Sequence, residues 1–312
     1  EYFQHWDWDY IITDVLTEND LGKSDLRIEL AIIFSQLDKE IRKNLWCKLT
    51  VRFSTEDIFN IVKTNSQLTN VSVVYEWNYS DVYNRQDFDI NKILTEYKDT
   101  EFPIDWDALS ASKALNKILL WDKKAIKDFS VWEDVVLSIL SDKAYNWNFK
   151  YLSTLASINW CDSILQSRES EWDWAYLSEH SKCFSFNLKR PFEIVKRIRR
   201  FDKYLDFGIL SKRIDMKLTM EMMSDLLKYS WDWTAISSNK GFLLTADFVQ
   251  ENKTLSWDWK ELSSRKDCKF SPEFILDNKS LSWDWQYLSK RKEIPFTAEI
   301  IIKLVDKEWD WK

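Results

Sequence analysis

Apolar and polar positions along this chain recur at a fixed spacing. The triplet Trp-Asp-Trp, followed by two variable residues, an aliphatic residue and Ser, begins at positions 231, 257 and 283. A shorter copy begins at 309, so the interval is 26 residues each time, and a degenerate copy begins 26 residues before the first, at Leu205. Self-similarity at a fixed period of roughly 20–50 residues is typical of repeat architectures. We therefore expect one supersecondary unit to recur along the chain.

Copies with looser spacing extend this pattern toward the N-terminus. They begin at Trp172, Trp147, Ile104, Tyr75, Asn44 and Trp6. In the resulting alignment of eleven copies the third position is always aromatic: Trp8, Trp46, Trp77, Trp106, Phe149, Trp174, Phe207, Trp233, Trp259, Trp285 and Trp311. Because the intervals are regular only in the second half, the sequence predicts irregular helical repeats over 1–171. Regular repeats are expected over 172–312, with both halves in one continuous array.

Each unit begins with the signals of a helix start. In the copy at 257, Asp258 is expected to be an N-cap whose carboxylate accepts from free amides of the first turn. Glu261, three residues on, completes the pattern of a capping box, and Trp257 with Leu262 that of a hydrophobic staple. The sequence therefore predicts a short helix over the second part of each motif.

A second helix start follows about fourteen residues into each unit. An apolar residue, a Ser or Thr cap and an early carboxylate recur there, with the caps at Thr219, Thr245, Ser271 and Thr297. Pro272 stands at the first helical position, where a missing N–H costs nothing. Asn252 and Asn278 fall near the end of this helix, where we expect a left-handed residue.

Helices this short are marginal in water, so they persist only if stacking buries the tryptophan face between neighbouring units. The chain of 312 residues holds 19 Trp but only 3 Gly and 4 Pro, which leaves little material for hairpins. We therefore predict an all-α fold: an α-solenoid of stacked antiparallel helix pairs, with 26 residues per repeat in the C-terminal half.

The pattern WDWxxLSxxKxxFSxEFIxxN resembles the tandem tryptophan-rich helical repeats found in proteins of giant viruses and some bacteria. The close match covers residues 172–312, and a degenerate version covers the remainder. The resemblance implies a recognition surface, like that of other helix-pair repeats, and it implies no reaction and no single ligand.

Composition narrows the classes of protein further. Cys47, Cys161, Cys183 and Cys268 stand far apart, which is unlike a disulfide scaffold or a zinc site and favours a reducing, cytoplasmic compartment. No apolar run reaches the roughly 18 residues of a membrane span, so no membrane contact is expected. The N-terminus resembles no signal peptide and lacks a starting Met, which favours a segment of a larger protein.

No catalytic motif accompanies the repeats. The two histidines, His5 and His180, have no partner at motif spacing, although a Ser-His-Asp arrangement need not be local in sequence. The Trp triplet is open to interpretation as an aromatic ligand box and the recurrent Asp as a catalytic or metal-binding group. Their cap positions favour structural roles. We expect no enzyme activity, no cofactor, no metal and no small-molecule substrate.

Two further features have both a structural and a functional interpretation. Met216, Met220, Met222 and Met223 indicate either plastic core packing or an adaptable binding surface. A basic edge between 182 and 213 and in the downstream turns either complements helix dipoles or binds a polyanion. Its candidate residues are Lys189, Arg190, Lys196, Arg197, Arg199, Arg200, Lys203, Lys212, Arg213, Arg265, Lys266 and Arg291.

These observations predict a scaffold or targeting module for protein–protein interaction, with a protein partner, inside a larger protein or complex. Nucleic-acid binding through the basic edge is the alternative, although the net charge of −7 opposes it. At the last copy, Trp309 and Trp311 are expected to pack on Ile300, Ile301 and Leu304 and to leave a partly apolar end face.

Overall fold

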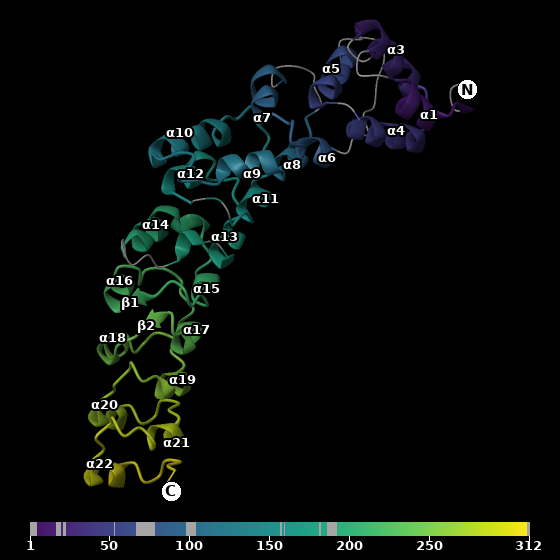
Figure 1. Ribbon diagram of the computed structural model, residues 1–312. Coiled ribbons are helices and arrows are strands. Elements are labelled where there is room, and N and C mark those ends of the chain that lie inside the picture. Colours follow the sequence, from purple (N-terminus) through teal and green to yellow (C-terminus); the bar gives the residue numbers. More distant parts are fainter. Residues whose placement is uncertain are drawn as a thin grey trace. The chain divides into compact units, whose positions relative to one another are not determined.

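The computed structural model describes residues 5–16, 20, 23–52, 54–66, 79–97, 104–156, 158, 160–180, 182–185 and 192–310. Over these residues the chain is mostly helical, as predicted, and its strands are confined to one pair of two residues each. It divides into two compact units, 1–171 and 172–312 (Figure 1). The division falls where the sequence pattern changes from irregular to regular copies.

The first unit contains helices of unequal length. They are α1 (Trp8–Tyr10), η2 (Ile11–Val15), α3 (Ser24–Ser35), α4 (Lys39–Arg52), α5 (Thr55–Ser66), α6 (Tyr79–Tyr83), α7 (Ile90–Lys92), η3 (Ile93–Tyr97), α8 (Trp106–Ser110), α9 (Lys113–Leu119), α10 (Phe129–Leu140), α11 (Phe149–Ser153) and α12 (Asp162–Ser167). Helix α3 packs against α5, α8 against α6, α9 and α11, and α10 against α12. The copies at 104 and 147 therefore start helices that are in contact.

The copy placed at Asn44 is wrong as a helix start. Residues 39–52 form one continuous helix, α4, and Trp46 lies near its middle rather than at its first turn. The degenerate copy NLWCKLT shares with the motif only an aromatic third position and an aliphatic sixth position, which also occur by chance within a longer helix. The copy at Tyr75, with Trp77, lies outside the described residues.

The second unit alternates two kinds of helix. The helices that begin with the third motif position, here called A helices, are α13 (Trp174–His180), α15 (Phe207–Leu210), α17 (Trp233–Ser238), α19 (Trp259–Ser264) and α21 (Trp285–Leu288). The B helices are α14 (Glu193–Phe201), α16 (Met220–Ser224), α18 (Ala246–Glu251), α20 (Pro272–Asp277) and α22 (Ala298–Lys303). Short 3-10 turns η4 (Lys182–Phe184) and η5 (Asp202–Tyr204) flank α14.

Within this unit, A helices follow one another in one column and B helices in another (Figure 1). Helix α13 packs against α15, α17 against α19, α19 against α21, and α20 against α22. Strands β1 (Leu218–Thr219) and β2 (Phe242–Leu243) pair in parallel, with Leu218 opposite Phe242. Neighbouring copies of the motif therefore contact each other in a repeated way.

The third-position aromatics form the core of this repeated contact. Trp233, Trp259 and Trp285 are each less than a tenth exposed. The ring of Trp233 meets that of Trp257 in the next unit at 4.9 Å and 61°, and Trp259 meets Trp283 at 4.9 Å and 64°. Edge-to-face pairs of this kind stabilise by about 0.5–1.5 kcal/mol beyond the area they bury.

The same burial extends to most other copies. Third-position aromatics are buried at Trp8, Phe149, Trp174 and Phe207 and half-buried at Trp106. The structure does not describe the side chain of Trp46, and Trp77 and Trp311 lie outside the described residues. The four methionines 216, 220, 222 and 223 are also buried, which supports core packing and contradicts an exposed Met surface.

The helix caps follow the predicted positions. Asp258 accepts hydrogen bonds from the backbone N–H groups of Lys260 and Glu261 at 3.0 and 3.1 Å. Equivalent carboxylate caps are Asp7, Asp105, Asp173, Asp206, Asp232 and Asp284. The B helices α16, α18, α20 and α22 are capped by the hydroxyls of Thr219, Thr245, Ser271 and Thr297.

Two details of the predicted caps are wrong. The N–H of Asp258 donates to Ser237 Oγ of the preceding unit at 2.9 Å, so Glu261 does not close a capping box. Asn252 and Asn278 end their helices at φ −112° and −113°, not in the left-handed region. Each side-chain amide instead donates to the carbonyl four residues before it, at 2.8 Å.

Candidate functional site

Most motif residues bind neighbouring motif copies rather than facing solvent. The Ser at the seventh motif position, for instance Ser263, donates its hydroxyl to the Trp259 carbonyl at 2.7 Å. The same oxygen accepts the N–H of the next unit's Asp284 at 3.0 Å. Ser211, Ser237 and Ser289 repeat the second bond to Asp232, Asp258 and Asp310. Sequence reasoning missed this role of Ser, whose only signal was its recurrence.

The first-position tryptophans also satisfy their polar atoms inside the array. The indole N–H groups of Trp231, Trp257, Trp283 and Trp309 each donate to a carbonyl five residues earlier, at 2.7–3.0 Å. In the copies at 231, 257 and 283 both aromatics are buried and the Asp is used as a cap, so the triplet offers no open aromatic box. The structural interpretation of Trp and Asp therefore holds in these copies.

Three arginines predicted to belong to the basic edge lie inside the protein. Arg213, Arg265 and Arg291 are 5–8% exposed. The guanidinium of Arg265 donates to the carbonyls of Ile236, Ser237, Asn239 and Phe242 in the preceding unit. It also pairs with Asp267 at 2.5 Å, as Arg213 pairs with Asp215 and Arg291 with Glu293. Their placement as polyanion ligands is therefore wrong, since their donors are already used.

Pairing with the buried arginines also changes the pKa of the partner carboxylates. Burial alone would raise the pKa of Asp267, but the hydrogen bonds and charge of Arg265 outweigh it and lower that pKa. The pKa of Asp215 is lowered in the same way by Arg213, with Ser185 donating a further hydrogen bond. Both acids therefore stay ionised well into the acid range.

The remaining basic candidates are divided between a helix face and the turns. Lys196, Arg199, Arg200 and Lys203 are exposed and recur at helical spacing on and just after α14, opposite its buried Ile194, Val195, Ile198 and Phe201. Arg199 pairs with Asp225 at 3.1 Å. Arg197 is half-buried and donates to the Cys183 carbonyl. Lys212 and Lys266 are exposed in the turns, and Lys189 and Arg190 lie outside the described residues.

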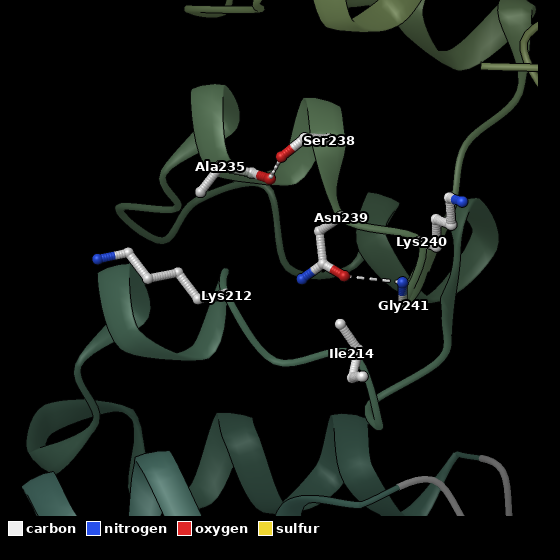
Figure 2. A pocket seen from close by; sticks show the side chains of 7 residues that line it. All are labelled: Lys212, Ile214, Ala235, Ser238, Asn239, Lys240 and Gly241. Atoms are coloured by element: carbon white, nitrogen blue, oxygen red, sulfur yellow. Dashed lines mark hydrogen bonds between the residues drawn. The ribbon is translucent and has the colours of Figure 1, made fainter. Parts of the chain in front are cut away.

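A cavity of about 570 Å³ opens in the second unit beside the turn that follows α17. It is lined by Lys212, Ile214, Ala235, Ser238, Asn239, Lys240 and Gly241 (Figure 2). Asn239 stands at its centre, with Lys212 and Lys240 on opposite sides (Figure 2). No motif in the sequence signalled this cavity. The one local sign is that Asn239 and Gly241 stand where the copies at 205, 257 and 283 carry Arg and an acid.

One cluster in the first unit holds nucleophilic groups. The Cys161 thiol, before α12, donates to the Glu133 carboxylate of α10 at 3.3 Å, and the Ser163 hydroxyl donates to the same oxygen. Burial is the main cause that raises the pKa of Cys161, so its thiol stays protonated at neutral pH. A protonated thiol is a poor nucleophile, and this cluster has the character of a half-buried polar contact.

The described residues contain no group of three His, Cys, Asp or Glu side chains that is arranged to hold a metal ion. His5 and His180 are both exposed, and the ring of His180 lies 4.6 Å from that of Tyr176. Nor does any helix in the described ranges combine the length and apolar character needed to cross a membrane.

Comparisons of the chain with protein families, with curated proteins and with solved structures each returned no match.

Proposed function

We propose that this chain is an α-solenoid of stacked antiparallel helix pairs that serves as a protein-binding scaffold or targeting module without catalytic activity. The resemblance to tryptophan-rich repeat proteins belongs to the same proposal. The partner would bind to exposed positions of the repeats, because the motif residues themselves are used to hold the units together.

The contrast between buried and exposed positions supports this proposal best. The buried positions barely change between the units at 231, 257 and 283: both Trp, the aliphatic residue and the Ser recur. The two positions after the third-position Trp differ in size and charge instead: Thr234-Ala235, Lys260-Glu261 and Gln286-Tyr287. All except half-buried Ala235 are exposed. A constant core with a variable surface is what stacked-repeat recognition modules have in common.

Partner capture by two surface variants tests this function. One variant replaces Lys260, Glu261, Gln286 and Tyr287 on the A helices with Ala. Its control replaces Glu251, Lys253, Asp277 and Lys279, exposed around the ends of B helices, with Ala and leaves the net charge equally unchanged. Each chain is immobilised and incubated with an extract of the source cells, and the bound proteins are quantified by mass spectrometry.

We expect at least one protein to be enriched on the wild-type chain, retained by the control and lost by the A-helix variant. The melting temperature of both variants should remain within a few degrees of the wild type, because exposed substitutions change stability by only about ±0.5 kcal/mol. Equal retention on all three chains, or no enrichment on the wild type, refutes the proposal.

Polyanion binding is a second candidate, and the basic face of α14 favours it. Three exposed cations, Lys196, Arg199 and Arg200, are spaced to lie on one face of α14, and exposed Lys203 follows in η5. Phosphate groups along a nucleic acid recur closely enough for such a face to contact several of them. Because Arg213, Arg265 and Arg291 are buried, the candidate polyanion-binding surface is restricted to the basic residues of α14 and the lysines of the turns.

A further inference from the structure

One unit departs from its neighbours in the turn after its A helix. The units at 205, 257 and 283 carry Arg at the ninth position and an acid two residues later, whereas the unit at 231 carries Asn239 and Gly241. Asn239 keeps part of the arginine's role, because its side-chain amide donates to the carbonyls of Ser211 and Arg213 at 2.8 and 3.0 Å. Its side-chain oxygen accepts the N–H of Gly241 at 2.8 Å.

The cavity of about 570 Å³ lies beside these shorter side chains. Gly241 also lets two turns approach closely: a Cβ at this position would lie 2.7 Å from the Arg213 carbonyl oxygen and from the Ile214 Cα and oxygen. No side chain fits at such a distance without movement of the backbone. The two residues that distinguish this unit therefore both line the cavity, and three hydrogen bonds hold the Asn239 side chain in place.

The chemistry of the cavity is basic and apolar. Among its lining residues, Lys212 and Lys240 are exposed cations on opposite sides of Asn239, and no acid is present (Figure 2). The charge of the neighbouring Arg213 is neutralised by Asp215 at 2.7 Å. Ile214 is 73% exposed, so its side chain is accessible to an apolar group of a ligand. A ligand complementary to these features carries negative charge at two points and an apolar group between them.

We propose that this cavity is the docking site for an extended acidic segment of a partner protein. An apolar side chain of the segment lies against Ile214 and Ala235, while flanking carboxylates pair with Lys212 and Lys240. Charge complementarity selects this occupant, and the exposed Ile214 favours a peptide over a nucleic acid, whose backbone has no apolar side chain to bury. The inference rests on the proposed function, since it names one surface through which the scaffold binds its partner.

The test uses the full chain and a short fluorescein-labelled peptide of alternating Glu and Leu, with fluorescence anisotropy at low salt. The charge variant is Lys212→Glu with Lys240→Glu, and the apolar variant is Ile214→Ser. The matched control is Lys266→Glu with Lys292→Glu, since these exposed lysines occupy the position of Lys240 in the next two units. All four lysines are exposed, so each double variant should fold as the wild type does.

We expect saturable binding of the acidic peptide, weakened about tenfold by the charge variant and severalfold by Ile214→Ser, and little changed by the control. The amide signal of Gly241 should shift in NMR spectra on titration with the peptide. A peptide with Lys in place of Glu should not bind. Absence of saturable binding, an equal loss in the control, or preferential binding of a single-stranded oligonucleotide at this site overturns the inference.

The same variants separate this inference from the proposed function. If the immobilised chain captures a partner and the Lys212→Glu, Lys240→Glu variant captures it equally well, the cavity is not the docking site and the scaffold function stands. If the wild-type chain captures no partner at all, the proposed function fails irrespective of the peptide result.

Discussion

A buried serine is the residue that most directly couples one unit to the next. Ser263 Oγ donates to the Trp259 carbonyl and accepts the Asp284 N–H, and Ser263 is fully buried. Replacement by Ala leaves that N–H without this acceptor, and an unsatisfied buried polar group costs about 1–3 kcal/mol. We predict that Ser263→Ala lowers the free energy of unfolding, measured in urea, by this amount.

The neighbouring serine is the control. Ser264 is exposed and donates only to the Glu261 carbonyl of its own helix, so Ser264→Ala should change stability by less than about 0.5 kcal/mol. Equal effects of the two substitutions would show that the Ser263 hydroxyl contributes no more to stability than a hydrogen bond within one helix.

The Trp and Asp of one motif should differ sharply in how much each contributes to the free energy of unfolding. Trp259 is 7% exposed and packs against Trp283, so Trp259→Ala should destabilise by roughly 3–5 kcal/mol. Asp258 caps α19 through two backbone N–H groups, and Asp258→Ala should cost about 1 kcal/mol. Urea unfolding of both variants measures the difference, and similar small losses at the two positions would contradict the packing described above.

Residues whose partners are close in sequence were the predictable ones. The carboxylate and hydroxyl caps act within three residues, so Asp258 and Ser271 were identified from spacing alone. Arg265 was misassigned to a surface because its carbonyl partners lie 23–29 residues earlier. No local pattern distinguishes such an arginine from a solvated one, although its pairing with an acid two residues later recurs in three units.

At the scale of the element, an Arg–acid pair stabilises the turns after α15, α19 and α21, and this pair predicts a response to pH. The folded pKa values of Asp215 and Asp267 lie below the ordinary value near 3.9. A depressed folded pKa gives stabilisation that is complete above the unfolded pKa and is lost as pH falls through the folded one. The free energy of unfolding should therefore decrease below about pH 4.

The double variant Asp215→Asn, Asp267→Asn should be less stable at pH 7 and should lose less stability than the wild type between pH 5 and 3. The control Asp277→Asn removes an exposed carboxylate on α20 and should follow the wild-type profile more closely. Urea titrations at each pH measure the difference. A profile of the double variant parallel to that of the wild type would show that these pairs do not govern the acid response.

The basic face of α14 gives a prediction about polyanions. If it binds one, replacing Lys196, Arg199, Arg200 and Lys203 with Gln should abolish retention on heparin or duplex DNA. The slope of log K against log salt should fall in magnitude by about 0.9 for each phosphate that the variant no longer neutralises. A control with Lys253, Lys260, Lys269 and Lys279 replaced by Gln, all exposed elsewhere in the second unit, should keep the slope. Salt-insensitive wild-type retention would exclude this candidate.

At the scale of the whole molecule, sequence periodicity predicted the regular part far better than the irregular part. From 172 onward each third-position aromatic with a described helix starts an A helix, and from 205 onward these starts follow the predicted 26-residue period. In the first unit the period breaks down, and α3, α4, α5 and α10 have 12–14 residues each. The long helices contact one another, α3 with α5 and α10 with α12, without a recurring motif at the contacts. The cavity at Asn239 was equally unpredictable from the sequence, because its lining residues come from two units and no local pattern joins them.

The last copy follows the same geometry as those before it. Trp309 packs on Trp285 and Phe296, and its indole N–H donates to the carbonyl of Leu304, one of the three residues predicted to contact it, at 2.7 Å. Trp311 lies outside the described residues. Ile302 and Val305, at 71% and 66% exposure, leave the outer side of α22 and its end apolar. The indole N–H bond to the carbonyl five residues earlier and the Asp N–H bond to the Ser of the preceding unit therefore recur at successive 26-residue steps.

This equivalence predicts that one whole unit can be deleted. Removal of residues 257–282 brings Trp283 to the place of Trp257, where it meets Trp233, and lets Asp284 donate its N–H to Ser237 as Asp258 does. The distance between the rings of Trp233 and Trp257 is 4.9 Å, the same as that between Trp259 and Trp283 one unit later. The Asp258 N–H lies 2.9 Å from Ser237 Oγ, close to the 3.0 Å between Asp284 and Ser263. Arg291 likewise takes the place of Arg265 opposite the carbonyls of the preceding turn.

We therefore expect the 26-residue deletion to give a folded chain with a cooperative thermal transition and a helical circular dichroism signal reduced by about one unit. If the units contact only their neighbours, as the proposed solenoid requires, stability is close to a sum of unit and neighbour terms, and the melting temperature should fall only modestly. Deletion of residues 257–269 removes half a unit and places a B-helix sequence where an A helix must stack, so that chain should lose its cooperative transition. If both deletions unfold the protein alike, the units are not interchangeable, and the contacts of this region depend on each individual sequence rather than on the repeat.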